Sequence, residues 1–226
     1  FLLYNYFKLF CLNQHLCYNL GMGKFITFEG GEGCGKSTLI QGLKDYFDKH
    51  GVNYVATREP GGLPLCEDIR NILKYSKQQI SKRAEFLLFS ASRAQLVEDF
   101  IRPQLDSGKI VICDRFFDSS RVYQGFANGL SDADIMAVTN FATGGLVPDL
   151  TFYLDIDPQV AFNRKGGRDK GDRIEERDIN YHQNVRLGYQ KIAKAETRFV
   201  VLDATMSKQQ ILDAVLEKLR KENIIE

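Results

Sequence analysis

The chain has 226 residues, of which 44% are hydrophobic and 26% are charged, a composition that suits one globular domain with a full core. Its 30 basic and 29 acidic residues leave a formal net charge of +1, which gives no reason to expect a nucleic acid or an anionic membrane as partner. The cysteines show no paired spacing, which favours reduced thiols in a cytoplasmic protein over disulfides or a zinc site; they are Cys11, Cys17, Cys34, Cys66 and Cys113.

The N-terminal segment, residues 1–21, is apolar and aromatic but is broken by polar residues such as Lys8 and Asn13. No run in it approaches the roughly 18–20 residues that a membrane span needs. We expect this segment to be an extension of unknown role outside the fold, and residues 22–226 to form one domain. A weak signal peptide or membrane anchor is the alternative.

From Lys24 onward, short apolar runs typical of strands alternate with longer segments of helical period. One of these, residues 81–108, carries an apolar stripe that includes Leu87, Ala91, Ala94 and Val97. Strands that alternate with helices predict a parallel sheet covered on both faces. The expected strands are residues 24–29, a strand in 52–62 that ends at a Pro-Gly break, 109–115, 150–157 and 198–205; the expected helices are 37–51, closed by Gly51, then 81–108, and about 207–221.

Residues 30–37 read GGEGCGKS and match the phosphate-binding pattern GxxxxGK[ST] between a predicted strand and a predicted helix. Glycines allow the backbone N–H groups to turn inward around a phosphate, and the helix N-terminus adds partial positive charge. Lys36 would bridge the β- and γ-phosphates of a nucleotide, and the Ser37 hydroxyl would bind Mg²⁺. We therefore predict an α/β fold of the P-loop NTPase type, a three-layer α/β/α sandwich with a five-stranded parallel sheet. The carboxylate of Glu32 is unexpected in a loop built for anions.

A second signal is the segment VICDR at residues 111–115, an apolar strand that ends in Asp114 and Arg115. A carboxylate at this position would lie near the metal ion of a P-loop enzyme, and the arginine would offer a planar fork to a second phosphate. An ordinary ion pair at the end of a strand is the alternative.

Six motifs follow one another along the chain: FEGGEGCGKST at 28–38, REPGG at 58–62, FSASR at 89–93, DRFFDSSRVYQG at 114–125, PDLTFYLD at 148–155, and DRIE at 172–175 after a basic stretch. In this order they resemble the motifs of thymidylate kinases of the bacterial kind, which belong to the P-loop nucleoside monophosphate kinases. The resemblance spans nearly all of residues 24–205 and leaves out the N-terminal extension. Its most distinctive motifs are REPGG and the stretch that ends in YQG.

The resemblance implies an enzyme that transfers the γ-phosphoryl group of ATP, with Mg²⁺, to dTMP, giving dTDP and ADP for dTTP synthesis. It also implies a cytoplasmic homodimer. The acceptor phosphate is already mostly ionised at neutral pH, because its second pKa is about 6, so no general base is needed. Catalysis would depend on positioning and on charge neutralisation.

The same resemblance assigns roles to residues on both sides of the transferred group. Arg58 and Arg115 would hold the dTMP phosphate, and Glu32 would accept a hydrogen bond from the 3′-hydroxyl, which explains a carboxylate in this loop. Phe89 would stack on thymine and Arg93 would donate to O4, although Phe89 taken alone is more typical of a core. The remaining dTMP-binding residues implied are Ser120, Tyr123, which would exclude a ribose 2′-hydroxyl, and Gln124; those for ATP are Gly30, Gly31, Glu32, Gly33, Cys34, Gly35, Lys36, Ser37, Thr38 and Arg164.

One departure from the family pattern concerns the P-loop. Some thymidylate kinases carry an arginine there, where this chain has Gly33 and Cys34. We expect a glycine-rich lid at about residues 164–176 to supply the missing charge, with Arg168 and Arg173 joining Lys36 and Arg115 as catalytic residues.

Two alternatives stay open. The first is another P-loop nucleoside or nucleotide kinase, for instance one that acts on a different pyrimidine. The second is a GTPase-like switch or an assembly ATPase, but the guanine-reading pattern [NT]KxD is absent.

Overall fold

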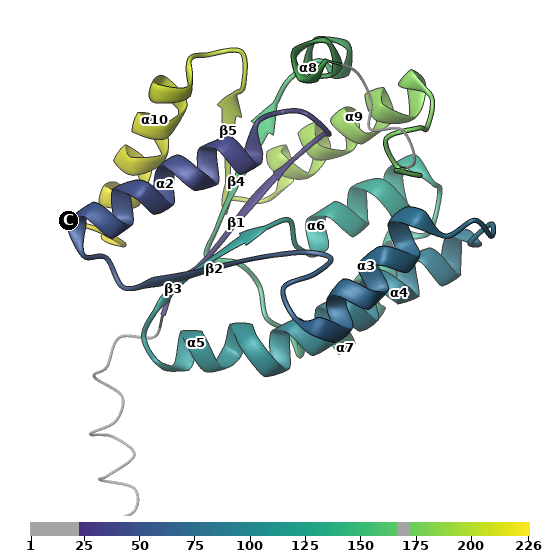
Figure 1. Ribbon diagram of the computed structural model, residues 1–226, viewed down its shortest axis with the longest axis horizontal. Helices are drawn as coiled ribbons and strands as arrows, with labels where there is room; N and C mark the ends of the chain where they lie inside the picture. The colour runs from purple at the N-terminus through teal and green to yellow at the C-terminus, as the bar shows by residue number, and fades with distance from the viewer. Residues whose placement is uncertain (1–22, 167–171) are drawn as a thin grey trace, which may run out of the picture.

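The computed structural model describes residues 23–166 and 172–226 (Figure 1). The predicted N-terminal extension and the centre of the predicted lid, including Arg168, lie outside the described residues. In chain order the elements are β1 (Phe25–Gly30), α2 (Lys36–His50), β2 (Tyr54–Arg58), α3 (Pro64–Tyr75), α4 (Lys82–Leu96), the π-helix η2 (Val97–Ile101), α5 (Arg102–Asp106), β3 (Ile110–Asp114), α6 (Phe117–Ser120), the π-helix η3 (Arg121–Ala127), α7 (Asp132–Thr143), β4 (Leu150–Asp155), α8 (Pro158–Lys165), α9 (Ile179–Ala195), β5 (Phe199–Asp203) and α10 (Lys208–Lys221).

The five strands form one sheet in the order β2-β3-β1-β4-β5, and every neighbouring pair is parallel. This confirms the predicted α/β fold with a five-stranded parallel sheet. In the register, Asp114 at the end of β3 lies between Phe28 of β1 and Arg58 of β2. The P-loop, Arg58 and the Asp114–Arg115 pair therefore meet at the same edge of the sheet.

Alternating side chains of the strands enter cores on opposite faces of the sheet. Ile26 and Phe28 of β1 pack under α2 and α10, whereas Phe25 packs on the other face with residues of α3, α4 and η2. A third cluster joins Tyr153 of β4 to α9 and η3. Figure 1 shows α2 and α10 on one side of the sheet and α3, α4, α5 and α7 on the other.

Helix α2 begins and ends within one residue of the predicted bounds. Gly35 precedes it with φ 100°, and Gly51 ends it with φ 68°; both angles lie in the left-handed region that favours glycine. The predicted strand in 52–62 is shorter than its segment, because β2 ends at Arg58 before the turn.

The predicted helix at 81–108 is one helical segment made of α4, η2 and α5. Its apolar stripe does not lie on a single buried face, since Val97 is buried while Leu87 is 55% exposed. Helix α4 instead turns Glu85 and Arg93 inward, where both have charged partners. Glu85 and Arg93 thus occupy buried positions of α4 where the helical period alone would predict apolar side chains.

Candidate active site

A cleft of about 1170 Å³ lies where the carboxyl ends of β1, β2 and β3 meet the P-loop, α4 and η3. A pocket for one drug-sized ligand measures about 300–1000 Å³, so this cleft can hold more than one such ligand. Most of the predicted site residues line it: Glu32, Gly33, Cys34, Gly35, Lys36, Ser37, Thr38, Arg58, Phe89, Asp114, Arg115, Ser120, Tyr123, Gln124 and Arg164. Of the remaining predicted residues with described positions, Gly30, Gly31, Arg93 and Arg173 are not among its lining residues.

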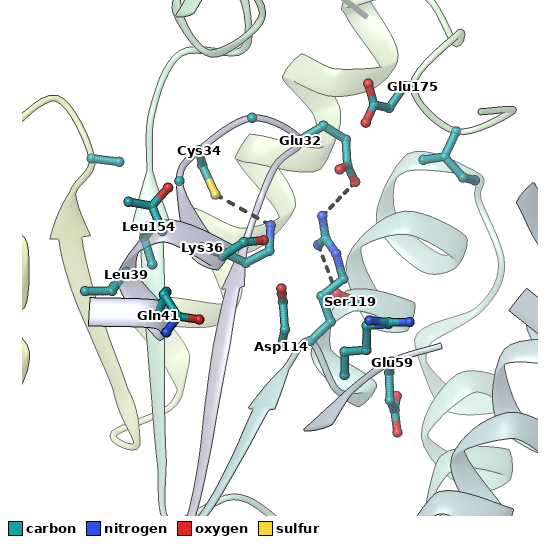
Figure 2. A pocket seen from close by; sticks show the side chains of 18 of the residues that line it. Glu32, Cys34, Lys36, Leu39, Gln41, Glu59, Asp114, Ser119, Leu154 and Glu175 are labelled. Carbon is teal, nitrogen blue, oxygen red and sulfur yellow. Dashed lines mark hydrogen bonds and ion pairs between the residues drawn. The ribbon is translucent and has the colours of Figure 1, made fainter. Parts of the chain in front are cut away.

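The P-loop closes around the amine of Lys36. Its Nζ donates to the carbonyl oxygens of Gly30 and Gly31, at 3.2 and 3.1 Å. Gly33 has φ 72°, and a Cβ there would meet the carbonyl oxygen of Ala161 at 2.9 Å, so the loop needs a glycine at this position. Figure 2 shows Lys36 and Asp114 facing the same cavity, with Glu32 nearby.

Glu32 is bound to the opposite wall of the cleft. Its Oε1 accepts from Nη2 of Arg115 at 2.6 Å and from the hydroxyl of Tyr123 at 3.1 Å. Burial acts to raise the pKa of Glu32, but the charges of Arg115 and Lys36 and the hydrogen bond from Tyr123 outweigh it and lower the pKa to about 2. Glu32 therefore faces the arginine of the predicted acceptor side, as its expected role requires.

Arg115 is held by contacts along its whole length. Its backbone has φ 71°, a left-handed conformation that costs energy for any residue other than glycine. Its Nη1 donates to the carbonyl oxygen of Gly30 at 2.8 Å and also contacts Ser119 Oγ and the hydroxyl of Tyr189, both at 3.3 Å. A strained residue with this many partners is fixed in position, and such residues cluster at functional sites.

A buried carboxylate, Glu29, supports those partners. It accepts from the N–H of Phe116 and from the hydroxyls of Ser119 and Tyr189, at 2.7, 2.6 and 2.7 Å. Burial, and then the neighbouring charge of Asp118, raise its pKa. No role for Glu29, Ser119 or Tyr189 was predicted from the sequence.

The end of β3 presents a buried carboxylate oxygen to the cleft. Asp114 Oδ1 is buried and has no hydrogen-bond partner among the residues that the structure describes. The neighbouring Arg58 is 54% exposed at its side chain and pairs with Glu67 of α3 at 2.8 Å. Ser37, whose hydroxyl is the other predicted metal ligand, lines the same cleft.

Of the predicted base-reading residues, Phe89, Ser120 and Gln124 line the cleft, and Arg93 is bonded to lining residues. Arg93 is 1% exposed, and its guanidinium donates to Glu59 at 2.8 Å and to Ser120 Oγ at 3.1 Å. Its Nη1 has no hydrogen-bond partner within the described parts of the chain. Burial raises the pKa of Glu59 to about 7 against the opposing charge of Arg93. Glu59 lies within the quoted REPGG motif, yet its pairing with Arg93 was not predicted.

The two ends of the predicted lid contact different parts of the molecule. On one side, Arg164 donates to the carbonyl oxygens of Ala204 and Thr205, at 2.6 and 3.2 Å. On the other side, Arg173 donates to the carbonyl oxygen of Leu73 at 2.9 Å and contacts Glu85 at 3.5 Å. Three residues near this end also line the cleft and were not predicted: Lys74, Asp172 and Glu175.

Comparisons with known proteins identify the family to which the chain belongs. A sequence model of the family described as thymidylate kinase matches residues 28–215. The thymidylate kinase of Finegoldia magna is 42% identical over 89% of this chain and 100% of its own length. The thymidylate kinase of a Thermoanaerobacter species is 44% identical over 88% of this chain and 98% of its own length. That of Symbiobacterium thermophilum is 48% identical over 84% of this chain and 89% of its own length. None of the helices that the structure describes is long and apolar enough to cross a membrane. The match to the family model and to relatives over nearly their whole length shows that the chain belongs to the thymidylate kinase family.

Proposed function

We propose that the protein transfers the γ-phosphoryl group of ATP to the phosphate of dTMP, giving dTDP and ADP. One observation carries this proposal. A single cleft is lined by a P-loop, with Lys36 and Ser37, and by an acceptor-side wall that includes Arg58, Arg115 and Gln124. A cleft with these two walls can bind a nucleoside triphosphate and a monophosphate end to end.

The chemistry needs charge neutralisation and alignment, because both reacting groups are anions. Lys36 lies at the P-loop end and would bind the phosphates of ATP once its amine leaves the carbonyl oxygens of Gly30 and Gly31. Arg115 is already oriented and would hold the phosphate of dTMP. Arg58 would also bind that phosphate, after its ion pair with Glu67 breaks. An ionised phosphate oxygen attacks without losing a proton, so no general base is required.

The residues present fit a magnesium ion, which would be held by Asp114 and Ser37 together with the phosphates. The fit rests on Asp114 Oδ1, a buried carboxylate oxygen at the phosphate end of the cleft without a partner among the described residues. Carboxylate and hydroxyl oxygens are ligands that Mg²⁺ prefers. When bound, the ion would neutralise charge on the transferring group.

The acceptor sugar would lie beside Glu32 and Tyr123, which are hydrogen-bonded to each other. We propose that Glu32 accepts from the 3′-hydroxyl and that the ring of Tyr123 occupies the space that a 2′-hydroxyl would need. Thymine would lie against Phe89. The donor to O4 would be Nη1 of Arg93, which has no partner among the described residues. Cytosine presents an amino donor at that position, so it would leave a polar group unmet.

For the lid, we propose that Arg168 or Arg173 closes over the transferred phosphoryl group. The present contacts of Arg173 with Leu73 and Glu85 would then have to break on closure. Residues 164–176 contain glycines at 166, 167 and 171, which permit such a change in the backbone.

We also propose a cytoplasmic homodimer. Three adjacent helices, α3, α4 and α7, expose apolar side chains: Ile72 is 47% exposed, Leu87 55% and Phe141 90%. Exposed apolar side chains on neighbouring helices are typical of a subunit interface. The free thiols of Cys34, Cys66 and Cys113 suit a reducing compartment. Sedimentation of wild type and Phe141→Asp tests the dimer, since only the variant should be monomeric.

The deciding experiment measures ADP release from ATP with and without dTMP, alongside dUMP, dCMP, UMP and thymidine. We expect release to depend on dTMP and to be far weaker with UMP and dCMP. Thymidine should not support it, because Arg58 and Arg115 would have no phosphate to bind. Equal release with another monophosphate would favour the alternative pyrimidine kinase, and release independent of any acceptor would refute the proposal.

A further inference from the structure

A buried carboxylate on α4 joins the base-reading end of the cleft to the segment that follows the lid. Glu85 is 1% exposed and accepts hydrogen bonds from the side chains of Gln124, at 3.0 Å, and Arg177, at 3.0 Å. Arg173 and Asn128 contact it more distantly, both at 3.5 Å. The mechanism proposed above gives Glu85 no part.

These partners determine which way the amide of Gln124 points. A guanidinium group carries donors only, so both oxygens of Glu85 act as acceptors toward Arg177. Because the carboxylate of Glu85 can only accept, Gln124 must donate to it through its amide N–H₂ group. Asn128 is oriented in the same way. Its Oδ1 accepts from Arg177 at 2.7 Å, so its amide nitrogen faces Glu85.

Gln124 also lies at the cleft. Gln124 is a lining residue and is only 2% exposed, and no hydrogen bond within the described residues reaches its Oε1. Thymine and uracil carry a donor N–H at N3, whereas cytosine carries an acceptor there. A fixed carbonyl oxygen at this position would pair with the first two bases and repel the third.

We propose that Glu85 is a positioning residue for base selection: it fixes Gln124 with its carbonyl oxygen toward N3 of the acceptor base. This inference rests on the proposed function and adds a second determinant to the donor that Arg93 presents. Arg177 has an indirect part, because it keeps Glu85 an acceptor on both oxygens.

The test is the variant Glu85→Gln, assayed with dTMP, dUMP and dCMP. Arg177 and Arg173 would still require the carbonyl oxygen of the new side chain, so its amide nitrogen would face Gln124. Gln124 would then reverse and present N–H₂ to the base. We expect kcat/KM for dCMP relative to dTMP to rise roughly 10-fold, the effect of one mispaired polar group. The ratio of dUMP to dTMP should stay unchanged, because both bases have the same N3–H.

Two controls separate positioning from a loss of stability. Glu98→Gln makes the same chemical change at an exposed position of the same helical segment and should leave all three substrates unaffected. In a Gln124→Leu background, Glu85→Gln should no longer change the ratio of kcat/KM for dCMP to that for dTMP, because Glu85 would act on the base only through Gln124.

An unchanged ratio of dCMP to dTMP in a folded Glu85→Gln protein would overturn the proposal, even if its Tm falls. If that variant does not fold, Gln124→Leu decides the matter alone: a raised ratio supports an N3 acceptor at Gln124, and a wild-type ratio refutes it. Wild-type protein without dTMP activity would instead mean that the proposed function fails.

Discussion

Replacing Glu32 by glutamine removes the charge that pairs with Arg115 and leaves the shape of the side chain nearly intact. The structure sets the size of the effect. The pKa of Glu32 is lowered from its ordinary 4.5 to about 2, because the charges of Arg115 and Lys36 outweigh the effect of burial. A difference of about 2.5 between the two pKa values corresponds to about 3 kcal/mol of folding stability at neutral pH. The side chain is 22% exposed, so this figure is an upper value.

The dependence on pH follows from the sign of that change. A carboxyl group with a lowered pKa contributes its full stability above pH 4.5 and loses it as the pH falls toward 2. Urea unfolding of wild type and Glu32→Gln should differ by up to about 3 kcal/mol at neutral pH and by about 1.4 kcal/mol less near pH 3.5. Glu222→Gln, at an exposed pair with Lys218, is the matched control and should show little change.

Kinetics give a second readout of the same variant. If Glu32 serves the acceptor sugar, Glu32→Gln should raise KM for dTMP far more than KM for ATP. Equal losses toward both substrates would argue against an acceptor-side role. A stability difference between the two proteins that does not shrink in acid would refute the ion-pair reasoning.

Four further outcomes are expected. Lys36→Ala should keep the far-ultraviolet circular dichroism of the fold but lose at least about 10²-fold in kcat, and an unchanged kcat would exclude the P-loop assignment. Tyr123→Ala should improve UMP relative to dTMP in the ADP-release assay, whereas an unmoved ratio would make Tyr123 purely structural. Asp114→Asn should raise the Mg²⁺ concentration needed for half-maximal activity, and an unaltered Mg²⁺ dependence would remove Asp114 from the metal site. Arg173→Ala should lower kcat roughly 10²-fold with little change in dTMP binding, since lid charges act in the transition state; wild-type turnover would limit Arg173 to its contacts with Leu73 and Glu85.

The fold was predictable because its information is local. Each of the five strands is a short apolar run, and α2 is bounded by glycines that its termini require. The glycine pattern of the P-loop likewise reports a backbone shape that few other residues permit. Helix α9 was not among the predicted helices, although its buried Tyr181, Val185, Tyr189 and Ile192 recur at helical spacing.

Much of the site could not be read from the sequence. Glu59 and Glu85 are buried, although glutamate is almost never fully buried unless it is paired. Glu59 is buried because Arg93 reaches it from α4, and Glu85 because Arg177 does so from a segment 92 residues away. Neither partner is identifiable until the chain is folded. The same holds for Arg115, whose left-handed backbone is not a local preference of arginine.

The pairing of Arg58 with Glu67 makes entry of the acceptor a competition. Glu67 is attached to the same chain, so it acts on Arg58 with the high effective concentration of a tethered ligand. A small free anion such as inorganic phosphate has only its charge with which to displace that carboxylate. A nucleotide also brings a base and a sugar that bind elsewhere in the cleft, and these contacts favour the exchange. The ion pair would thus keep the phosphate position closed to simple anions and admit a phosphate that arrives with its nucleoside.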